Sequence, residues 1–376
     1  MLKKVIIIFL LSSILLLNGC NQSSDSSVST ATNNVSTAAS EVTIVSNDNI
    51  KQKPSFITAE EVIRKLASGE FKGRLTGTDE NNKAAQYISY IFSKIGLEKY
   101  NNESYILSYI QDEFPERLKQ PQMKDKTIKA QHVIGIIPGK DHSKAVVLTA
   151  HYDHIGSDKS GNIISGAVDN ASGIGALTDI AQILKDQKNV PEQDVLICAL
   201  DGEEEGLQAA TMLAEQLKNS YTSFYNIDFD CIGVKGDNNI VFAGDSAVSG
   251  KLIDEMGKHL LKTGIQSKVM DSYGQKYFNS EYSYLDDSNT AISYINASFA
   301  NSLAFSFKGI KSVTFMQNVT HENPDPAFKN MMEKVQPKPY IVHSISDTVD
   351  KMDFKFIEKI SDLVVKFIES SSGKMF

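Results

Sequence analysis

Short apolar runs alternate with amphipathic segments along most of the chain. Runs such as Val146-Val147-Leu148 and Val195-Leu196-Ile197 are apolar on both faces, which is typical of central, largely parallel strands covered by helices on both sides. The pattern predicts strands at 133–137, 145–150, 194–200, 224–229, 240–243 and 312–316. It predicts helices near 171–186, 206–219, 247–263 and 353–370. We therefore expect an α/β fold with a mostly parallel, mixed central sheet.

Polar residues mark the ends of two earlier helices. Thr58 followed by Glu61 forms a capping box, after which apolar residues continue at helical spacing. A second helix is expected from about Glu80 to Lys94, and Gly96 should end it.

The first nineteen residues have the pattern of a signal peptide. Lys3 and Lys4 precede an apolar run of about thirteen residues, Val5 to Leu17, which is shorter than the roughly 20 that a membrane span needs. The run ends at Leu17-Asn18-Gly19-Cys20, which resembles the lipobox of bacterial lipoproteins. The resemblance implies acylation of Cys20 and a lipid anchor on the extracytoplasmic side of the bacterial cell membrane. Plain secretion with a chance cysteine is the alternative.

The composition changes again after the cysteine. Residues 20–55 are rich in Ser, Thr, Asn and Val and lack any helical or strand period, as expected of a flexible tether. About 320 residues remain, enough for one large α/β domain. We therefore divide the chain into a signal peptide (1–19), a tether (20–55) and a folded domain (56–376).

Charge and cysteine content exclude several classes of protein. The chain carries 38 Lys and Arg against 46 Asp and Glu, a net charge of −8, so nucleic acid is not an expected partner. Its three cysteines (Cys20, Cys198 and Cys231) are too few for a disulfide scaffold or a zinc ribbon.

Polar residues follow three predicted strands, at the point where each strand ends. His151 and Asp153 come after the second strand, Glu203 and Glu204 after the third, and Asp228 closes the fourth. In open α/β sheets ligands bind beyond the carboxyl ends of the strands. A lone His-x-Asp is commonly a solvated turn and an acidic run a solvated helix start, but three such groups at one edge indicate a site. Imidazole and carboxylate ligands suit zinc, cobalt or manganese at a hydrolytic centre.

Two further segments carry potential ligands. Asp169 precedes a helix full of small residues, where its carboxylate could bridge two metals or cap the helix. Near the end of the chain, His343 supplies an imidazole four residues before Asp347.

Several motifs, in this order along the chain, resemble the co-catalytic di-zinc aminopeptidase family, which also contains glutamate carboxypeptidases and glutaminyl cyclases. They are Gly73-Arg74-Leu75-Thr76-Gly77-Thr78, Ala150-His151-Tyr152-Asp153-His154, Gly166-Ala167-Val168-Asp169-Asn170-Ala171-Ser172-Gly173, Gly202-Glu203-Glu204-Glu205-Gly206-Leu207, Asn226-Ile227-Asp228, and His343 with Asp347-Thr348. The similarity extends over roughly residues 56 to 370 and implies a zinc exopeptidase fold.

The resemblance implies a ligand set for two zinc ions. His151 and Asp228 hold one zinc, Glu204 and His343 hold the other, and Asp169 bridges them. Because the segment after Asp228 is one or two residues longer than the commonest form of the family, Asp230 is a rival ligand.

The family pattern also implies roles for two carboxylates outside the ligand set. Glu203 is the general base that takes the proton of a metal-bridged water and passes it to the leaving amine. Asp153 orients the imidazole of His151.

Some residues near the motifs have a plainer interpretation. His154 is expected to support the ligands from behind or to be a loop residue beside the site, rather than to bind metal itself. The tyrosine-rich stretch 273–294 either packs in the core or lines a specificity pocket, and 321–324 is unassigned. Three histidines without motif context are assigned to the surface: His132, His142 and His259.

The function that these features indicate is an extracytoplasmic zinc aminopeptidase acting on peptides, with residues 56–376 as the catalytic domain. Lys and Arg are sparse near the motifs, which disfavours the basic pocket that a carboxypeptidase needs. The alternatives are another hydrolase of the same family, carboxypeptidase-like or glutaminyl cyclase-like, and a peptide-binding lipoprotein without activity. The sequence leaves the oligomeric state open.

Overall fold

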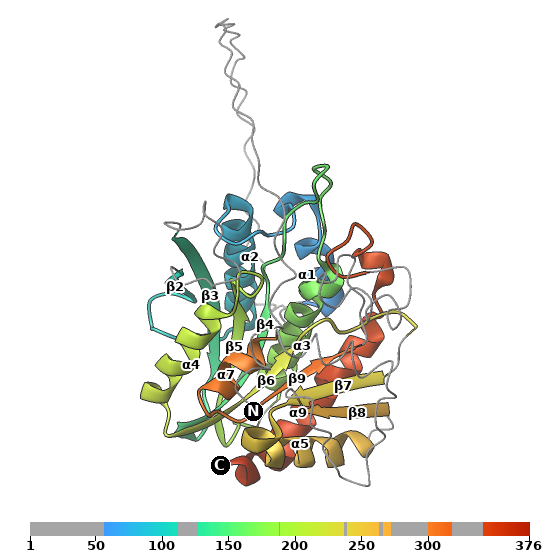
Figure 1. Ribbon diagram of the computed structural model, residues 1–376. Helices are drawn as coiled ribbons and strands as arrows, with labels where there is room; N and C mark the ends of the chain where they lie inside the picture. The colour runs from blue at the N-terminus through green and yellow to red at the C-terminus, as the bar shows by residue number, and fades with distance from the viewer. Residues whose placement is uncertain are drawn as a thin grey trace, which may run out of the picture. The chain divides into compact units, whose positions relative to one another are not determined.

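A computed structural model describes residues 56–111, 127–187, 189–236, 239–262, 266–271, 300–317 and 341–376 (Figure 1). The predicted signal peptide, Cys20 and the tether lie outside these residues, and so do 273–294 and 321–324. Among the described helices none has the length and apolar character that crossing a bilayer requires.

One mixed sheet forms the centre of the described structure. Its strands run in the order β1-β3-β5-β4-β6-β9-β7-β8, and β2 pairs with β3. The central strands β5, β4, β6 and β9 are parallel, whereas β3 and β7 join them antiparallel. The bounds are β1 Glu98–Lys99, β2 Ile106–Gln111, β3 Ile128–Ile137, β4 Asp141–His151, β5 Gln193–Leu200, β6 Ser223–Phe229, β7 Asn239–Gly244, β8 Gln266–Asp271 and β9 Ser312–Met316.

Helices cover both faces of this sheet (Figure 1). Along β4, alternate side chains enter different cores, with Val146 and Leu148 in one and Val147 in the other. The first core is closed by α1 Ala59–Leu66, α2 Asp79–Ile95, α3 Ser172–Asp186, α5 Ser246–Leu261 and α9 Phe354–Met375. The second is closed by α4 Gln208–Ser220 and α7 Asn301–Phe307. The predicted fold class is confirmed.

Local signals located most of these elements. Both hydrogen bonds of the capping box at Thr58 are present, and Gly96 ends α2 in the left-handed conformation at φ 81°. All six predicted strands occur. The elements that the pattern missed, including β2 and the seven-residue α7, are short or lie at an edge, where apolar periodicity is weak.

The parallel strands bring their carboxyl ends to one edge. His151 at the end of β4 pairs with Leu200 at the end of β5, and Thr149 pairs with Asp228 near the end of β6. Residues that directly follow these strands are therefore neighbours, although they are far apart in the sequence.

Candidate metal centre

Histidine and carboxylate side chains from five segments meet at this edge. We call them the metal cluster: His151 at the end of β4 and His154 after it, Asp169 in the short helical segment η4 (Ala167–Ala171), Glu203 and Glu204 after β5, Asp230 after β6, and His343. Their ligand atoms form overlapping groups in which all members lie within 4.8 Å of one another.

Asp169 lies at the middle of the cluster. Its Oδ1 is 3.2 Å from Nε2 of His151, and its Oδ2 is 3.2 Å from Nε2 of His343. Each oxygen therefore faces a different imidazole, which is the arrangement that a bridging carboxylate needs. The alternative of a helix cap is not realised, because Ala171 is the N-cap of α3 and the side chain that accepts the N–H of Gly173 in its first turn is that of Asn170.

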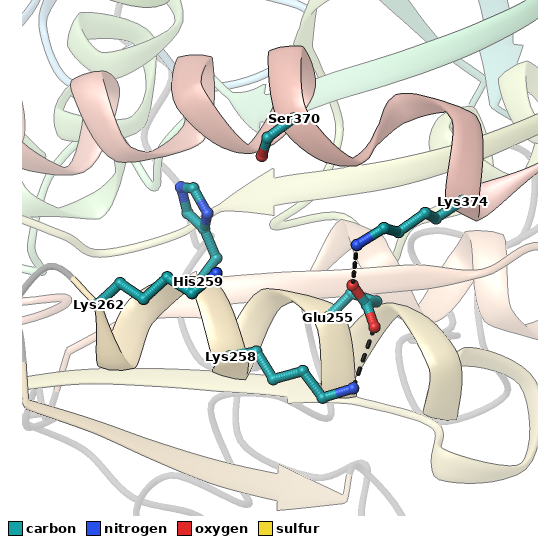
Figure 2. A pocket seen from close by; sticks show the side chains of 6 residues that line it. All are labelled: Glu255, Lys258, His259, Lys262, Ser370 and Lys374. Atoms are coloured by element: carbon teal, nitrogen blue, oxygen red, sulfur yellow. Dashed lines mark hydrogen bonds and ion pairs between the residues drawn. The ribbon is translucent and has the colours of Figure 1, made fainter.

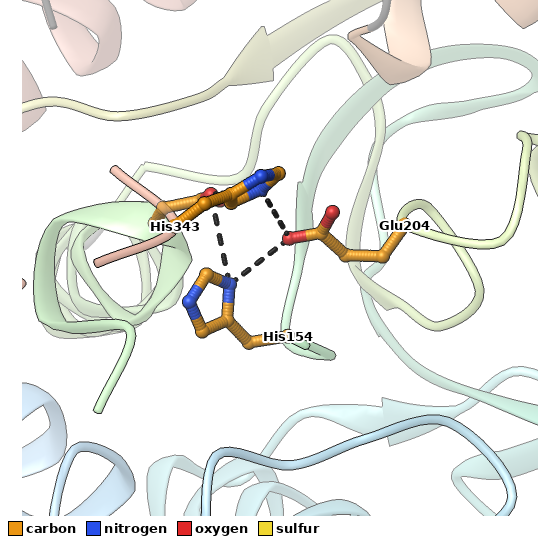
Figure 3. A group of neighbouring side chains, drawn as sticks. His154, Glu204 and His343 are labelled. Atoms are coloured by element: carbon orange, nitrogen blue, oxygen red, sulfur yellow. Dashed lines mark hydrogen bonds and ion pairs between the residues drawn. The ribbon is translucent and has the colours of Figure 1, made fainter. Parts of the chain in front are cut away.

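Glu204 faces the same side of the cluster as His343. Its Oε1 lies 3.0 Å from Nε2 of His343 and 2.9 Å from Nδ1 of His154 (Figure 3). Burial raises the pKa of Glu204, but the charge of His343 and the hydrogen bonds with His154 and His343 together outweigh it and lower the pKa to about 2. Glu204 is thus an anion at the place where the resemblance puts a ligand. His154, which was not expected to bind metal, contacts the same carboxylate oxygen as His343.

The structure corrects the prediction that Asp228 is a ligand. Asp228 accepts hydrogen bonds from the hydroxyls of Thr149 (2.6 Å) and Thr314 (3.3 Å) on the adjacent strands β4 and β9. Asp230 instead lies with the cluster, its Oδ1 being 3.6 Å from Nε2 of His151. Asp228 belongs to β6 and faces the hydroxyls of its two neighbouring strands, while Asp230 lies just beyond the last strand residue, Phe229.

Asp153 lies where an orienting group is expected. Its Oδ1 is 3.6 Å from Nδ1 of His151, the ring nitrogen opposite the one that faces Asp169. Its Oδ2 accepts the backbone N–H of Glu204 at 3.2 Å. One carboxylate thereby contacts both sides of the cluster.

Glu203 groups with His151 and Asp230 rather than with Glu204. Burial raises the pKa of Glu203 well above its usual range, and the charges of Glu204 and Asp230 raise it further. A carboxylate with a raised pKa is a stronger proton acceptor than an ordinary one, which is the property required of a general base.

The donor set fits zinc. Imidazole and carboxylate donors at tetrahedral zinc have bonds of about 2.0–2.2 Å, which places neighbouring ligand atoms roughly 3.3 Å apart. The pairs that His151 makes with Asp169 and Asp230 measure 3.2 and 3.6 Å. Nε2 of His151 is nevertheless buried without a hydrogen bond, so these contacts lack hydrogen-bond geometry and suit a shared cation.

Cys231 also comes close to Asp169 and Asp230. Burial raises the pKa of its thiol well above the usual range, and the charge of Asp230 adds to the effect. Because zinc binds thiolate, a thiol whose pKa is raised by burial is a poor ligand.

Asp201 is a buried acid that Thr76 links to Asp153, and no sequence signal identified it. The Thr76 hydroxyl is 3.2 Å from Asp153 Oδ2 and 3.1 Å from Asp201 Oδ1. Burial, together with the charge of Asp153, raises the pKa of Asp201 to about 7. The Asp201 N–H donates to Nδ1 of His132, which is fully buried. The assignment of His132 to the surface is therefore wrong.

A hollow of about 300 Å³ lies elsewhere, between α5 and α9 (Figure 2). Glu255 in its wall pairs with Lys258 (3.1 Å) and Lys374 (3.3 Å), and the lining shares no residue with the metal cluster. The metal cluster therefore remains the candidate active site.

Known proteins match the part of the chain that carries this cluster. Residues 132–368 match Peptidase family M28. The "Probable zinc metalloprotease" of Pyrenophora tritici-repentis (strain Pt-1C-BFP) is 36% identical over 86 residues, which are 22% of this chain and 17% of that protein. The chain thus matches less than a fifth of this relative's length.

Solved structures show the same fold. A zinc aminopeptidase from Bacillus subtilis superposes with a TM-score of 0.59 at 14% identity, covering 86% of this chain and 96% of that one. A glutaminyl cyclase from Bacteroides thetaiotaomicron bound to N-acetylhistamine superposes with a TM-score of 0.58 at 18% identity, covering 84% and 99%. The cluster's donor set fits zinc, and the family match spans most of the folded part of the chain. The chain therefore belongs to peptidase family M28.

Proposed function

We propose that the chain is an extracytoplasmic aminopeptidase that uses two zinc ions to remove N-terminal residues from peptides. The placement of Asp169 carries this proposal. Its Oδ1 faces the donor group that contains His151, and its Oδ2 faces the donor group that contains His343. The carboxylate of Glu203 lies beside the group that contains His151. This is the arrangement of a two-metal hydrolase with its own general base.

The chain's side chains divide between two metal positions. His151, Asp230 and Oδ1 of Asp169 would hold one zinc, and Glu204, His343 and Oδ2 of Asp169 would hold the other. When bound, the zinc ions supply Lewis acidity, which polarises the peptide carbonyl and makes water more acidic.

Glu203 would carry the proton. Its carboxylate takes a proton from the attacking water, the C–N bond of the peptide breaks, and the protonated Glu203 returns the proton to the leaving amine. The raised pKa of Glu203 suits the first step, because burial and the neighbouring carboxylates make this carboxylate a stronger base.

The charges around the cluster favour an aminopeptidase. A substrate's α-amino group is cationic and suits carboxylates, whereas a carboxypeptidase needs a cation for the terminal carboxylate. Arg74 is a buried cation of this region, and its guanidinium donates to the carbonyls of Leu66, Tyr152, Ser165 and Gly166. It is therefore committed to the backbone and not available to a substrate.

Two alternatives suit this geometry less well. Glutaminyl cyclases of this family work with one metal, as the resemblance implies, and two facing donor groups favour a two-metal site. A peptide-binding lipoprotein would have no use for a base such as Glu203. We further propose that a lipid on Cys20 anchors the protein outside the bacterial membrane and that its partners are peptides rather than nucleic acids.

The decisive experiment uses the full chain and Glu203→Gln, with Glu205→Gln on the same turn as the matched control. Zinc content is measured together with hydrolysis of amino-acyl anilides, N-blocked anilides and C-terminal peptide substrates, and with cyclisation of N-terminal glutamine. We expect two zinc equivalents and cleavage of free-amine anilides only. Glu203→Gln should keep both zinc ions and lose about 10²–10⁴-fold in turnover, while Glu205→Gln stays active. One zinc equivalent, or turnover unaffected by Glu203→Gln, would contradict the proposal.

A further inference from the structure

His154 faces the same two oxygen atoms as His343. Nδ1 of His154 lies 2.9 Å from Glu204 Oε1 and 3.6 Å from Asp169 Oδ2. Nε2 of His343 lies 3.0 Å and 3.2 Å from those oxygens. Figure 3 shows both rings directed at one carboxylate oxygen of Glu204. The ring centroids are 5.5 Å apart and tilted by 56°, so the rings converge through their nitrogens rather than by stacking.

The spacing of these atoms is that of a zinc coordination shell. Four donors at tetrahedral zinc lie roughly 3.3 Å from one another for bonds of about 2.0–2.2 Å. The four contacts between the two imidazoles and the two carboxylate oxygens range from 2.9 to 3.6 Å. His154 is fully buried, so water does not compete for its ring nitrogen.

We propose that His154 is a zinc ligand, through Nδ1, and completes a four-donor site with Asp169, Glu204 and His343. This rests on the zinc centre proposed above. It departs from the resemblance, which assigns no ligand role to this position. The histidine that the sequence suggested to be a neighbour of the site thereby becomes part of it.

The proposal makes the two metal positions unequal. The group around His343 would hold zinc with four protein donors, whereas His151, Asp230 and Asp169 supply three on the other side. Closed four-ligand sites are typical of structural zinc, and catalytic zinc keeps an open position. Glu203 groups with the three-donor side, so the open position and the base coincide. The four-donor site should fill first and hold its zinc more tightly.

Zinc affinity, not activity, tests this inference. The metal-free full chain is titrated with zinc against a chromogenic chelator, and His154→Asn is compared with His154→Asp. Asparagine keeps a hydrogen-bond donor for Glu204 near the place of Nδ1 but removes the imidazole, whereas aspartate supplies another zinc ligand. The exposed His142→Asn is the control, and circular dichroism of the metal-free variants checks their fold.

We expect His154→Asn to weaken one of two zinc sites by at least about 100-fold, beyond the 10–100-fold that loss of an outer hydrogen-bond partner costs. His154→Asp and His142→Asn should retain both sites. X-ray absorption of the wild type should count three imidazoles for two zinc ions, where a set without His154 gives two. A smaller loss in His154→Asn, or a count of two, overturns the proposal. A chain that binds zinc in this way but cleaves no peptide would refute the proposed function and leave the role of His154 intact.

Discussion

The carboxylate of Asp347 accepts the backbone N–H of Asp169 at 3.1 Å, although 178 positions separate them in the sequence. Its other oxygen accepts the N–H of Val168 at 2.6 Å. Asp347 lies four residues after His343 in the sequence. The loop that supplies the imidazole of His343 therefore also holds the backbone at Asp169, whose carboxylate faces both donor groups. The loop that carries His343 and the segment that carries Asp169 are thereby coupled through one buried acid.

Removing Asp347 should loosen the zinc site. Asp347→Ala leaves two buried N–H groups without an acceptor, which costs about 1–3 kcal/mol each in unfolding free energy. Zinc affinity should fall by about 10–100-fold, because the backbone that orients Asp169 is no longer held. Chelator competition and urea unfolding measure the two effects. Asp350→Ala, an exposed change in the short helical turn Val349–Lys351 that follows this loop, is the control. Unchanged zinc affinity in Asp347→Ala would refute the coupling.

Replacing Asp228 and replacing Asp230 should affect zinc binding differently. Asp230→Asn should weaken zinc binding, since this carboxylate faces His151. Asp228→Asn should bind zinc as the wild type does, because the amide can still meet the hydroxyls of Thr149 and Thr314. Burial and the charge of Asp230 already raise the pKa of Asp228 to about 7, so a neutral side chain is tolerated there. The zinc stoichiometry of the purified variants measures this difference. Loss of zinc in Asp228→Asn, with zinc retained in Asp230→Asn, would show that Asp228 is the ligand.

Arg74 should resist even conservative replacement. Its guanidinium donates to the carbonyls of Leu66, Tyr152, Ser165 and Gly166 at 2.5–2.8 Å, and the side chain is fully buried. A lysine ammonium cannot reproduce this fork, so Arg74→Lys leaves buried carbonyls unpaired.

We expect Arg74→Lys to lower the unfolding free energy by at least about 3 kcal/mol, measured by denaturant unfolding. The matched control is Arg64→Lys, whose exposed side chain pairs with Glu60 and should change stability by less than about 0.5 kcal/mol. Equal stability of the two variants would show that the backbone contacts of Arg74 are unimportant.

Asp179 should make stability depend on pH. Burial raises its pKa to about 7, with smaller contributions from the charges of Glu358 and Asp362. The unfolded carboxyl titrates near 3.9, so the native state binds the extra proton between about pH 4 and 7. The stability contributed by Asp179 is thus full below pH 4 and is lost as the pH rises through 7.

Asp179→Asn should remove this loss, because the amide oxygen can still accept the N–H of Ala59. Relative to wild type, the variant should gain on the order of 3 kcal/mol between pH 4 and pH 8, measured by unfolding of metal-free protein. Asp186→Asn, exposed on the same helix, should follow the wild-type profile. Parallel profiles for wild type and Asp179→Asn would contradict the assignment.

The sequence by itself determined the elements and the chemistry. The apolar runs located β3 to β6, β7 and β9, because a strand buried on both faces is continuously apolar, and the caps at Thr58 and Gly96 are local. The ends of the predicted strands brought His151, Glu203 and Glu204 to one edge, and the resemblance added Asp169 and His343. The metal cluster contains all five.

Only the tertiary structure decided which atoms face one another. The choice of Asp230 over Asp228 depends on where β6 ends, and spacing along the chain does not reveal that. The loop after β4 brings His154 next to Glu204 in the cluster. His132 is buried, and its Nδ1 accepts the N–H of Asp201. Such contacts join segments far apart in sequence and are set by packing, whereas periodicity and capping act over a few residues.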